Sequence, residues 1–194
     1  MFPQRTCQDT AALVLLALAL AGAALSGCSE RLEWREFRSS DGYAVLLPGR
    51  AQTVAREVEF EGRPLPVTMT SAGVGPVLFA VGTAVLPAAV ANDAAARERV
   101  IAHFRDGLVR NIGGTVTSTG PASMPLPPGS VRELRAAQSV EARGRAGPDG
   151  RAAQLAARFF IVDDRLFQLV ALGAEGGLEP RALETFFTSF RLTP

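Results

Sequence analysis

The chain has 194 residues, of which 47% are hydrophobic, which suits a globular protein with a buried core and excludes wholesale disorder. All 20 basic residues are arginine, so chemistry that needs a lysine, such as a Schiff base or a P-loop lysine, is excluded. The net charge is only +1, so the chain lacks the large positive charge typical of nucleic-acid-binding proteins, and we expect no binding to nucleic acid.

The N-terminus has the pattern of an export signal. Residues 11–25 contain only Ala, Leu, Val and Gly, a run that suits a signal peptide but is shorter than the roughly 20 residues of a membrane-spanning helix. The run leads into Leu-Ser-Gly-Cys at residues 25–28, which resembles the lipobox of bacterial lipoproteins. That resemblance implies a signal peptide over residues 1–27, cleavage before Cys28, and lipid (palmitate included) on its thiol. The alternatives are an uncleaved membrane anchor and an ordinary secretory signal with a chance cysteine.

The predicted lipid would hold the mature protein at a membrane of the bacterial cell envelope, facing the periplasm or, in a Gram-positive cell, the outside. Residues 28–33 would form a short tether, and residues 34–194 a single α+β domain. Ser29 follows the cysteine at the position where Asp favours retention in the inner membrane, so the outer membrane is favoured. Because Cys7 would leave with the signal peptide, the domain would have no disulfide.

The first half of the domain reads as strands that end in turns. The strand at residues 43–47 lies between Asp41-Gly42 and Pro48-Gly49, and the next carries Val54, Val58 and Phe60 on one face. Strands at residues 65–71 and 77–86 complete a β-meander.

A helix follows the meander. After Asn92 or Asp93 as N-cap, one apolar stripe recurs at helical spacing until Gly113-Gly114, so we expect this helix to lie across a sheet. The stripe contains Val100, Ile101, Phe104, Leu108 and Ile112.

The second half alternates strands with loops. We expect strands at residues 115–119, 131–140 and 151–162, a Pro-rich loop at 120–130, and a mobile, Gly-rich connection at 143–150. Asp163-Asp164 should turn the chain between residues 155–162 and 165–172. These strands are apolar on both faces, so both faces of the sheet must be covered.

A C-terminal helix is the predicted second cover. Pro180 should begin it, and Leu183, Phe186, Phe187 and Phe190 follow at helical spacing. The predicted fold class is therefore α+β, with an antiparallel β-sheet sandwiched by helices.

Three segments carry a resemblance to a known family. Trp34, Phe37 and the sequence Gly-Tyr-Ala-Val-Leu-Leu-Pro-Gly at residues 42–49 resemble the opening of PsbP-like domains. Residues 186–192 resemble their closing helix-to-strand segment, and the hairpin at 158–172 is similar in style. The resemblance implies an α/β/α sandwich. The family includes extrinsic photosystem proteins and uncharacterised bacterial lipoproteins, and because its characterised members act by binding, no catalytic residue is carried over.

The sequence offers few candidates for catalysis. His103 is the one histidine, and a boundary position on the helix explains it better than a catalytic base or ligand. No second His or Cys would complete a metal site in the mature chain, so we expect no metal and no cofactor. Asp163 and Asp164 fit a hairpin turn, and Glu57 and Glu59 fit a solvated strand face better than a calcium site.

Three functions follow, in order of preference. The first is a membrane-anchored, non-enzymatic binding or accessory module with an envelope protein as partner, engaged through a sheet edge or loop. The second is a carrier of an apolar small molecule or lipid in a cavity between sheet and helix. The third, an enzyme, would need a cleft converging on His103, Asp163 or Asp164. Trp34, Phe37 and Tyr43 could form an aromatic ligand surface, but an N-terminal strand plugging the core is favoured.

Overall fold

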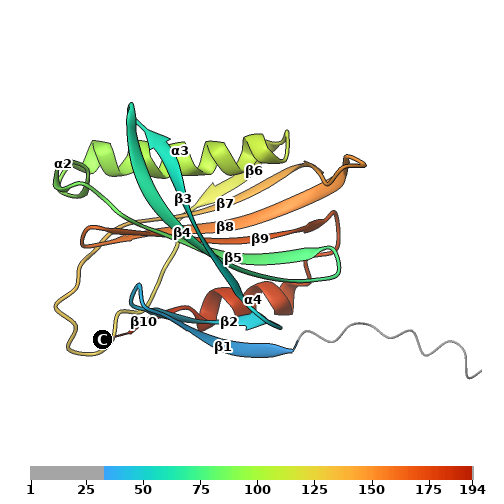
Figure 1. The fold of residues 1–194 in the computed structure, drawn as a ribbon, viewed down its shortest axis with the longest axis horizontal. Helices are drawn as coiled ribbons and strands as arrows, with labels where there is room; N and C mark the ends of the chain where they lie inside the picture. Colours follow the sequence, from blue (N-terminus) through green and yellow to red (C-terminus); the bar gives the residue numbers. More distant parts are fainter. Residues whose placement is uncertain (1–32, 194) are drawn as a thin grey trace, which may run out of the picture. The chain divides into compact units, whose positions relative to one another are not determined.

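The computed structural model describes residues 33–193 as an α+β fold dominated by antiparallel sheets (Figure 1), which confirms the predicted class at that level. The predicted signal peptide, Cys28 and most of the predicted tether lie outside the described residues. The elements are β1 (Trp34–Ser39), β2 (Tyr43–Pro48), β3 (Gln52–Phe60), β4 (Arg63–Val74), β5 (Val77–Val85), α2 (Ala88–Ala91), α3 (Ala94–Asn111), β6 (Thr115–Gly120), β7 (Leu134–Ala146), β8 (Arg151–Val162), β9 (Arg165–Ala174), α4 (Pro180–Ser189) and β10 (Arg191–Leu192). No helix within residues 33–193 is long and apolar enough to span a membrane.

Seven strands form the main sheet in the order β3-β4-β5-β9-β8-β7-β6, with antiparallel pairing between neighbours. The last three strands of the predicted meander are confirmed as β3-β4-β5. The first, at residues 43–47, is wrongly placed in the meander, because β2 pairs with β1 and β10 instead of β3. The chain then passes through α2 and α3 to the far edge of the sheet and returns through β7 and β8, so that β9 pairs with β5. A smaller sheet has the order β1-β2-β10.

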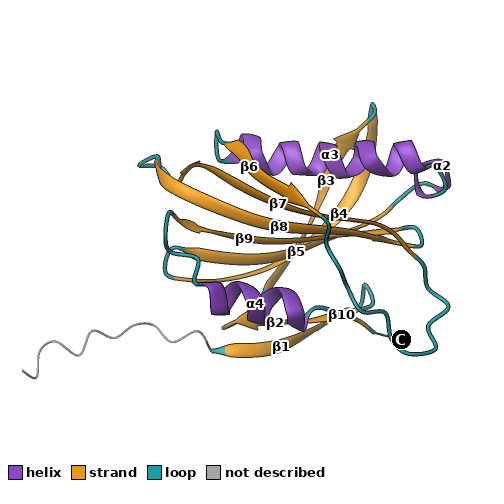
Figure 2. Cartoon of the chain, turned by 180° about the vertical axis from the view of Figure 1, so that it is seen from behind, coloured by secondary structure: helices purple, strands orange, loops and turns teal. Residues whose placement is uncertain are grey.

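The two faces of the main sheet have different covers. Figures 1 and 2 show α3 on one face, and α4 with the small sheet on the other. Side chains alternate along β8 as its apolar pattern requires: Phe159 and Ile161 belong to the core under α3, and Phe160 and Val162 to the core under α4. The expectation that both faces must be covered is therefore confirmed.

The helix α3 begins and ends where the sequence predicts. The Asp93 carboxylate accepts a hydrogen bond from the Ala96 N–H at 2.6 Å and caps the first turn. Beyond the last turn, Gly113 adopts a φ of +50°, a conformation that favours glycine. Val100, Ile101 and Phe104 are buried against the sheet.

The core under α4 is aromatic. Pro180 occupies the first turn of α4, and the fully buried Phe186 packs its ring 5.1 Å from that of Phe79. Trp34 contacts the same Phe79 ring from β1, and the buried Tyr43 from β2 packs against Phe167. The prediction that an N-terminal strand packs its aromatic side chains into the core is confirmed.

Polar contacts join the small sheet to the main sheet. The Thr83 hydroxyl on β5 donates to the Asp41 carboxylate at 2.6 Å, and the Arg165 guanidinium lies 3.2 Å from the same carboxylate. Nearby, burial raises the pKa of the Tyr43 hydroxyl, the Asp41 charge raises it further, and the Thr70 and Ser39 hydroxyls only partly oppose this. A negative charge on Tyr43 is therefore disfavoured in the folded protein.

The strand β7 is longer than predicted. It spans Leu134–Ala146, so the predicted bounds of the connection, 143–150, are wrong, and only residues 147–150 separate β7 from β8. Gly144 explains the extension, because a Cβ there would collide with the Ile112 backbone at the end of α3. The next residue donates its backbone N–H to the Ile112 carbonyl at 2.6 Å, so the strand continues directly beneath the helix end. Val131, predicted to be in a strand, lies outside one and is fully exposed.

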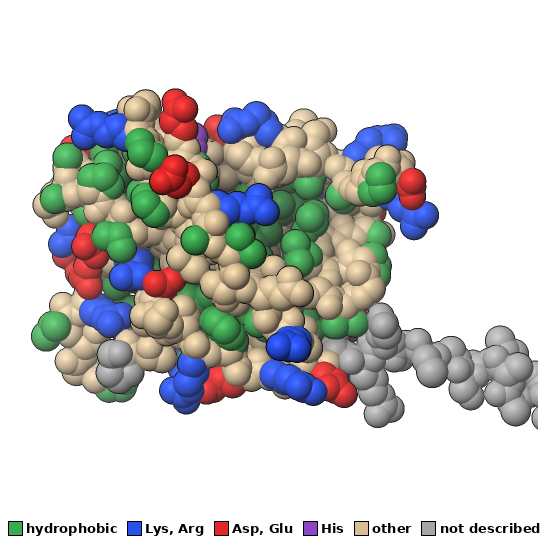
Figure 3. Space-filling view, in the orientation of Figure 1, with side chains coloured by type: hydrophobic (Ala, Val, Ile, Leu, Met, Phe, Trp, Pro, Cys, Tyr) green, Lys and Arg blue, Asp and Glu red, His purple; other side chains and the backbone are tan. Residues whose placement is uncertain are grey.

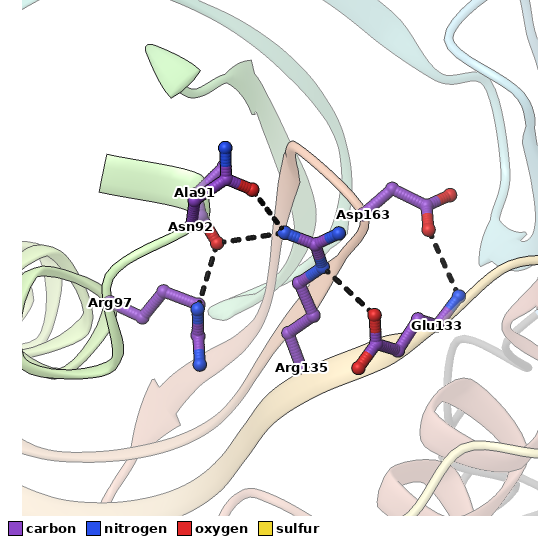
Figure 4. A network of polar contacts seen from close by, with 6 residues as sticks. All are labelled: Ala91, Asn92, Arg97, Glu133, Arg135 and Asp163. Carbon is purple, nitrogen blue, oxygen red and sulfur yellow. Dashed lines mark hydrogen bonds and ion pairs between the residues drawn. The ribbon is translucent and has the colours of Figure 1, made fainter. Parts of the chain in front are cut away.

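A polar network holds the corner between α2 and α3 (Figure 4). The Arg135 guanidinium on β7 donates to the Ala91 carbonyl at 3.0 Å and to the Asn92 side-chain oxygen at 2.7 Å. Arg97 donates to the same Ala91 carbonyl at 2.8 Å. These contacts satisfy the Ala91 carbonyl at the end of α2 and secure the start of α3 to the sheet.

Candidate binding groove between α3 and the sheet

One helix cannot cover a seven-stranded sheet. Neighbouring strands lie about 4.8 Å apart, so the sheet is about 29 Å wide, whereas a helix with its side chains is about 10–12 Å across. Since α3 packs along β7, the strands β3, β4 and β5 at the other side of the sheet are left partly uncovered. A groove follows from this mismatch.

The groove has a volume of about 430 Å³ and lies between the C-terminal half of α3 and strands β3, β4, β5 and β9. Figure 3 shows a hollow below α3 in which hydrophobic side chains gather, with arginine side chains at its edge. Two of the most exposed large hydrophobic residues, Val54 on β3 and Leu78 on β5, lie along it. The remaining apolar lining comes from Val58, Val67, Met69, Ala80, Phe104 and Leu108.

Gln168 is a buried polar residue in this apolar lining. It lies on β9, is only 5% exposed, and its Oε1 accepts no hydrogen bond from any described residue. Its neighbour across the sheet is Gly82, where a Cβ would lie 2.7 Å from the sulfur of Met69. The missing side chain at Gly82 thus leaves space for Met69 next to Gln168. An unpartnered buried acceptor costs about 1–3 kcal/mol, a cost that a hydrogen-bond donor on a bound molecule would remove.

Gly107 lines the groove from the helix side. Glycine within a helix costs about 1 kcal/mol relative to alanine. A Cβ at Gly107 would approach only the Arg110 guanidinium, at 3.8 Å, so the position has room for a side chain that the sequence does not supply. The glycine widens the groove at the expense of helix stability.

The charged lining is entirely basic. Arg56 on β3 and Arg110 in the last turn of α3 line the groove with His103, whereas no Asp or Glu does. The His103 ring packs 5.4 Å from Phe60 and 5.8 Å from Phe104. It is partly buried, which agrees with the predicted boundary position.

The structure does not bring the other candidate residues to this groove. Asp163 and Asp164 form the hairpin turn between β8 and β9, as predicted, and line a separate polar hollow with Asp41. The Asp163 carboxylate accepts the Glu133 backbone N–H at 2.9 Å, and the Asp164 carbonyl accepts that of Leu86 at 2.7 Å. Both residues therefore stabilise the hairpin turn and the segments next to it, and neither lies beside His103 in the groove.

The remaining predictions concern surface and core positions. Glu57 and Glu59 are exposed on β3, as predicted for a solvated face. Trp34, Phe37 and Tyr43 pack into the core under α4 rather than forming an aromatic surface. Within residues 33–193, no group of three or more metal-ligating side chains is placed to hold a metal ion.

Sequence reasoning missed the residues that define the groove. Gln168 is the one polar residue in the apolar run 166–172 after the Asp163-Asp164 turn, and this contrast was the available signal. Gly107, in the middle of the predicted helix, was a second one. Arg56 and Arg110 carried no local signal, since arginine is common throughout the chain.

Comparison with known proteins adds little. No family model matches the chain, and no curated protein matches it. Among solved structures, a similar one is the crystal structure of a protein of unknown function from Pseudomonas aeruginosa, described as a candidate regulator. The identity is 11%, the TM-score is 0.33, and the match covers 78% of this chain and 86% of that chain. A similarity this low carries no argument about fold or function.

Proposed function

We propose that this protein is a lipid-anchored protein of the bacterial envelope that binds an apolar small molecule or lipid in the groove beside α3. One observation carries the binding role: an apolar groove of about 430 Å³ in which the buried Oε1 of Gln168 lacks a hydrogen-bond partner among the described residues. Small-molecule sites typically have about 300–1,000 Å³, apolar walls and a few polar groups. The groove favours the carrier over the other predicted function, a module for an envelope protein partner, which stays a prediction.

The lining suggests how an occupant would be held. An apolar chain would remove the exposed parts of Val54 and Leu78 from water, which contributes about 25 cal/mol per Å² of apolar surface. A hydroxyl or amide N–H on the occupant would donate to Gln168. The flexible Met69 lies beside Gln168, and a change of its rotamer would open access to the carboxamide.

The membrane anchor is the second part of the proposal. Lipid on Cys28 would hold the domain near a membrane, because residues 28–33 reach at most about 20 Å before β1 begins at Trp34. A binding groove so placed could exchange apolar molecules with the bilayer. We expect Cys28→Ala to abolish incorporation of labelled palmitate, and persistent labelling of the variant would refute the anchor.

The PsbP-like α/β/α sandwich belongs to the same proposal. The placement of α3 and α4 on opposite faces of one antiparallel sheet supports it. A binding function also fits a family whose characterised members act by binding.

Photolabelling tests the binding role. The full chain, in phosphatidylcholine vesicles, would be irradiated with a neutral alkanol that carries a diazirine, and the labelled peptides mapped by mass spectrometry. We expect label on α3 and on β3, β4 and β5. Gly107→Leu should remove it, since leucine fills the groove while favouring the helix by about 1 kcal/mol. The control Ala95→Leu places the same leucine side chain at an exposed position in the first turn of α3 and should leave labelling unchanged. Labelling that Gly107→Leu does not reduce would contradict the proposal.

A second pair of variants tests the polar contact. Gln168→Leu should weaken alkanol labelling about threefold to tenfold, the worth of one hydrogen bond. Gln138 on β7 also has an Oε1 without a partner among the described residues, but it does not line the groove. Gln138→Leu should therefore leave labelling intact, and equal effects of the two variants would rule out Gln168 as a ligand contact.

A further inference from the structure

The groove has a charge as well as an apolar lining. Its three ionisable lining residues are Arg56, Arg110 and His103. Neither arginine takes part in an ion pair or a side-chain hydrogen bond with another described residue. By contrast, two other arginines of α3, Arg99 and Arg105, form ion pairs with Glu61 and Asp106 respectively. The groove therefore carries positive charge without a counter-ion from the described chain.

The end of α3 does not cancel this charge. A helix C-terminus carries about half a negative charge. Part of this charge is already compensated, because the Gly113 N–H donates to the Arg110 carbonyl at 2.9 Å and the Gly114 N–H to the Val109 carbonyl at 3.0 Å. Arg110 would offset what remains. Arg56, on the facing strand β3, adds a full positive charge, so the groove is positive on balance.

We infer that the occupant of the groove is a single-chain amphiphile with an anionic head group, an inference that rests on the proposed function. The apolar chain would lie along Val54 and Leu78, and the head group would meet the guanidinium groups of Arg56 and Arg110. A single chain fits best because about 430 Å³ is at the lower end of the volumes of small-molecule sites. Guanidinium groups bind carboxylate and phosphate alike, so the head group could belong to a free fatty acid or to a lysophospholipid.

Competition against the photoreactive alkanol tests the charge. With the full chain in phosphatidylcholine vesicles, the competitors are decanoate, a lysophosphatidylglycerol, decanol and decyltrimethylammonium. We expect an anionic competitor to displace the label at about tenfold lower concentration than decanol, through a charge-assisted contact, and the cation to be weakest. Preference for decanoate would identify a fatty acid, and preference for the lysophospholipid a lipid head group.

Arginine variants connect the preference to the groove. Arg56→Gln with Arg110→Gln should bring decanoate and decanol to equal potency. The control, Arg50→Gln with Arg181→Gln, removes two exposed arginines away from the groove and should keep the preference. Decanol that competes as well as the anions in the unaltered chain would overturn the inference and leave the groove as an apolar site. Failure of every competitor to displace the label would overturn the proposed function itself.

Discussion

The two faces of the main sheet differ in how completely they are covered. On the α4 side, a helix and three additional strands cover the apolar side chains, and the large aromatic residues there are buried except Trp34 and Phe37, which are partly buried. On the α3 side, one long helix covers the strands nearest to β7, while Val54 and Leu78 at the other side remain partly exposed. The difference indicates that the α4 side provides packing, whereas the α3 side combines packing with a groove.

The largest expected difference between the faces lies in the cost of removing a phenylalanine. Phe186→Ala, in the closed core under α4, should lower the free energy of unfolding by about 3–5 kcal/mol. Phe104→Ala, under α3 and beside the groove, should cost about 1–2 kcal/mol less, because the new space opens to solvent rather than forming a sealed cavity. Urea denaturation of both variants measures this, and equal costs would show that the faces are equally well packed.

The sheet face under α4, the closed face, was largely predictable because its signals are local. The apolar spacing from Leu183 to Phe187, with Pro180 before it, predicts a helix with one buried side. The alternation along β8 shows that both faces of the sheet need a cover. Each of these patterns depends only on the period of one element, which the chain displays directly.

The sheet face under α3, the open face that carries the groove, was harder to predict because it depends on tertiary geometry. The groove exists because seven strands are wider than one helix, and no single segment shows how many strands pair or where α3 lies on them. The true length of β7 was missed because Ala142, Gly144 and Ala146 are too small to give an apolar pattern, although Gly144 is what lets α3 approach.

Alkaline pH should weaken the closed face through Tyr43, the one tyrosine of the chain. Burial raises the pKa of its hydroxyl in the folded state above the unfolded value of about 10. The proton therefore stabilises the fold fully below about pH 10. This contribution is lost as pH rises through the folded pKa, by up to about 1.4 kcal/mol per pH unit. Tyr43→Phe should flatten this alkaline loss of stability in urea denaturation, and an unchanged pH profile would contradict the assignment.

The smallest effect on stability should separate binding from folding on the open face. Val54 on β3 is 50% exposed and lines the groove, whereas Val116 on β6, the opposite edge strand, is 41% exposed and does not. Val54→Thr and Val116→Thr should each change the free energy of unfolding by less than about 0.5 kcal/mol, since neither side chain is in a core. Only Val54→Thr should weaken photolabelling by the alkanol, because it places a hydroxyl in the apolar lining. If both variants weakened labelling equally, the exposed valines would be ordinary surface residues, and the difference between the two faces would have no bearing on binding.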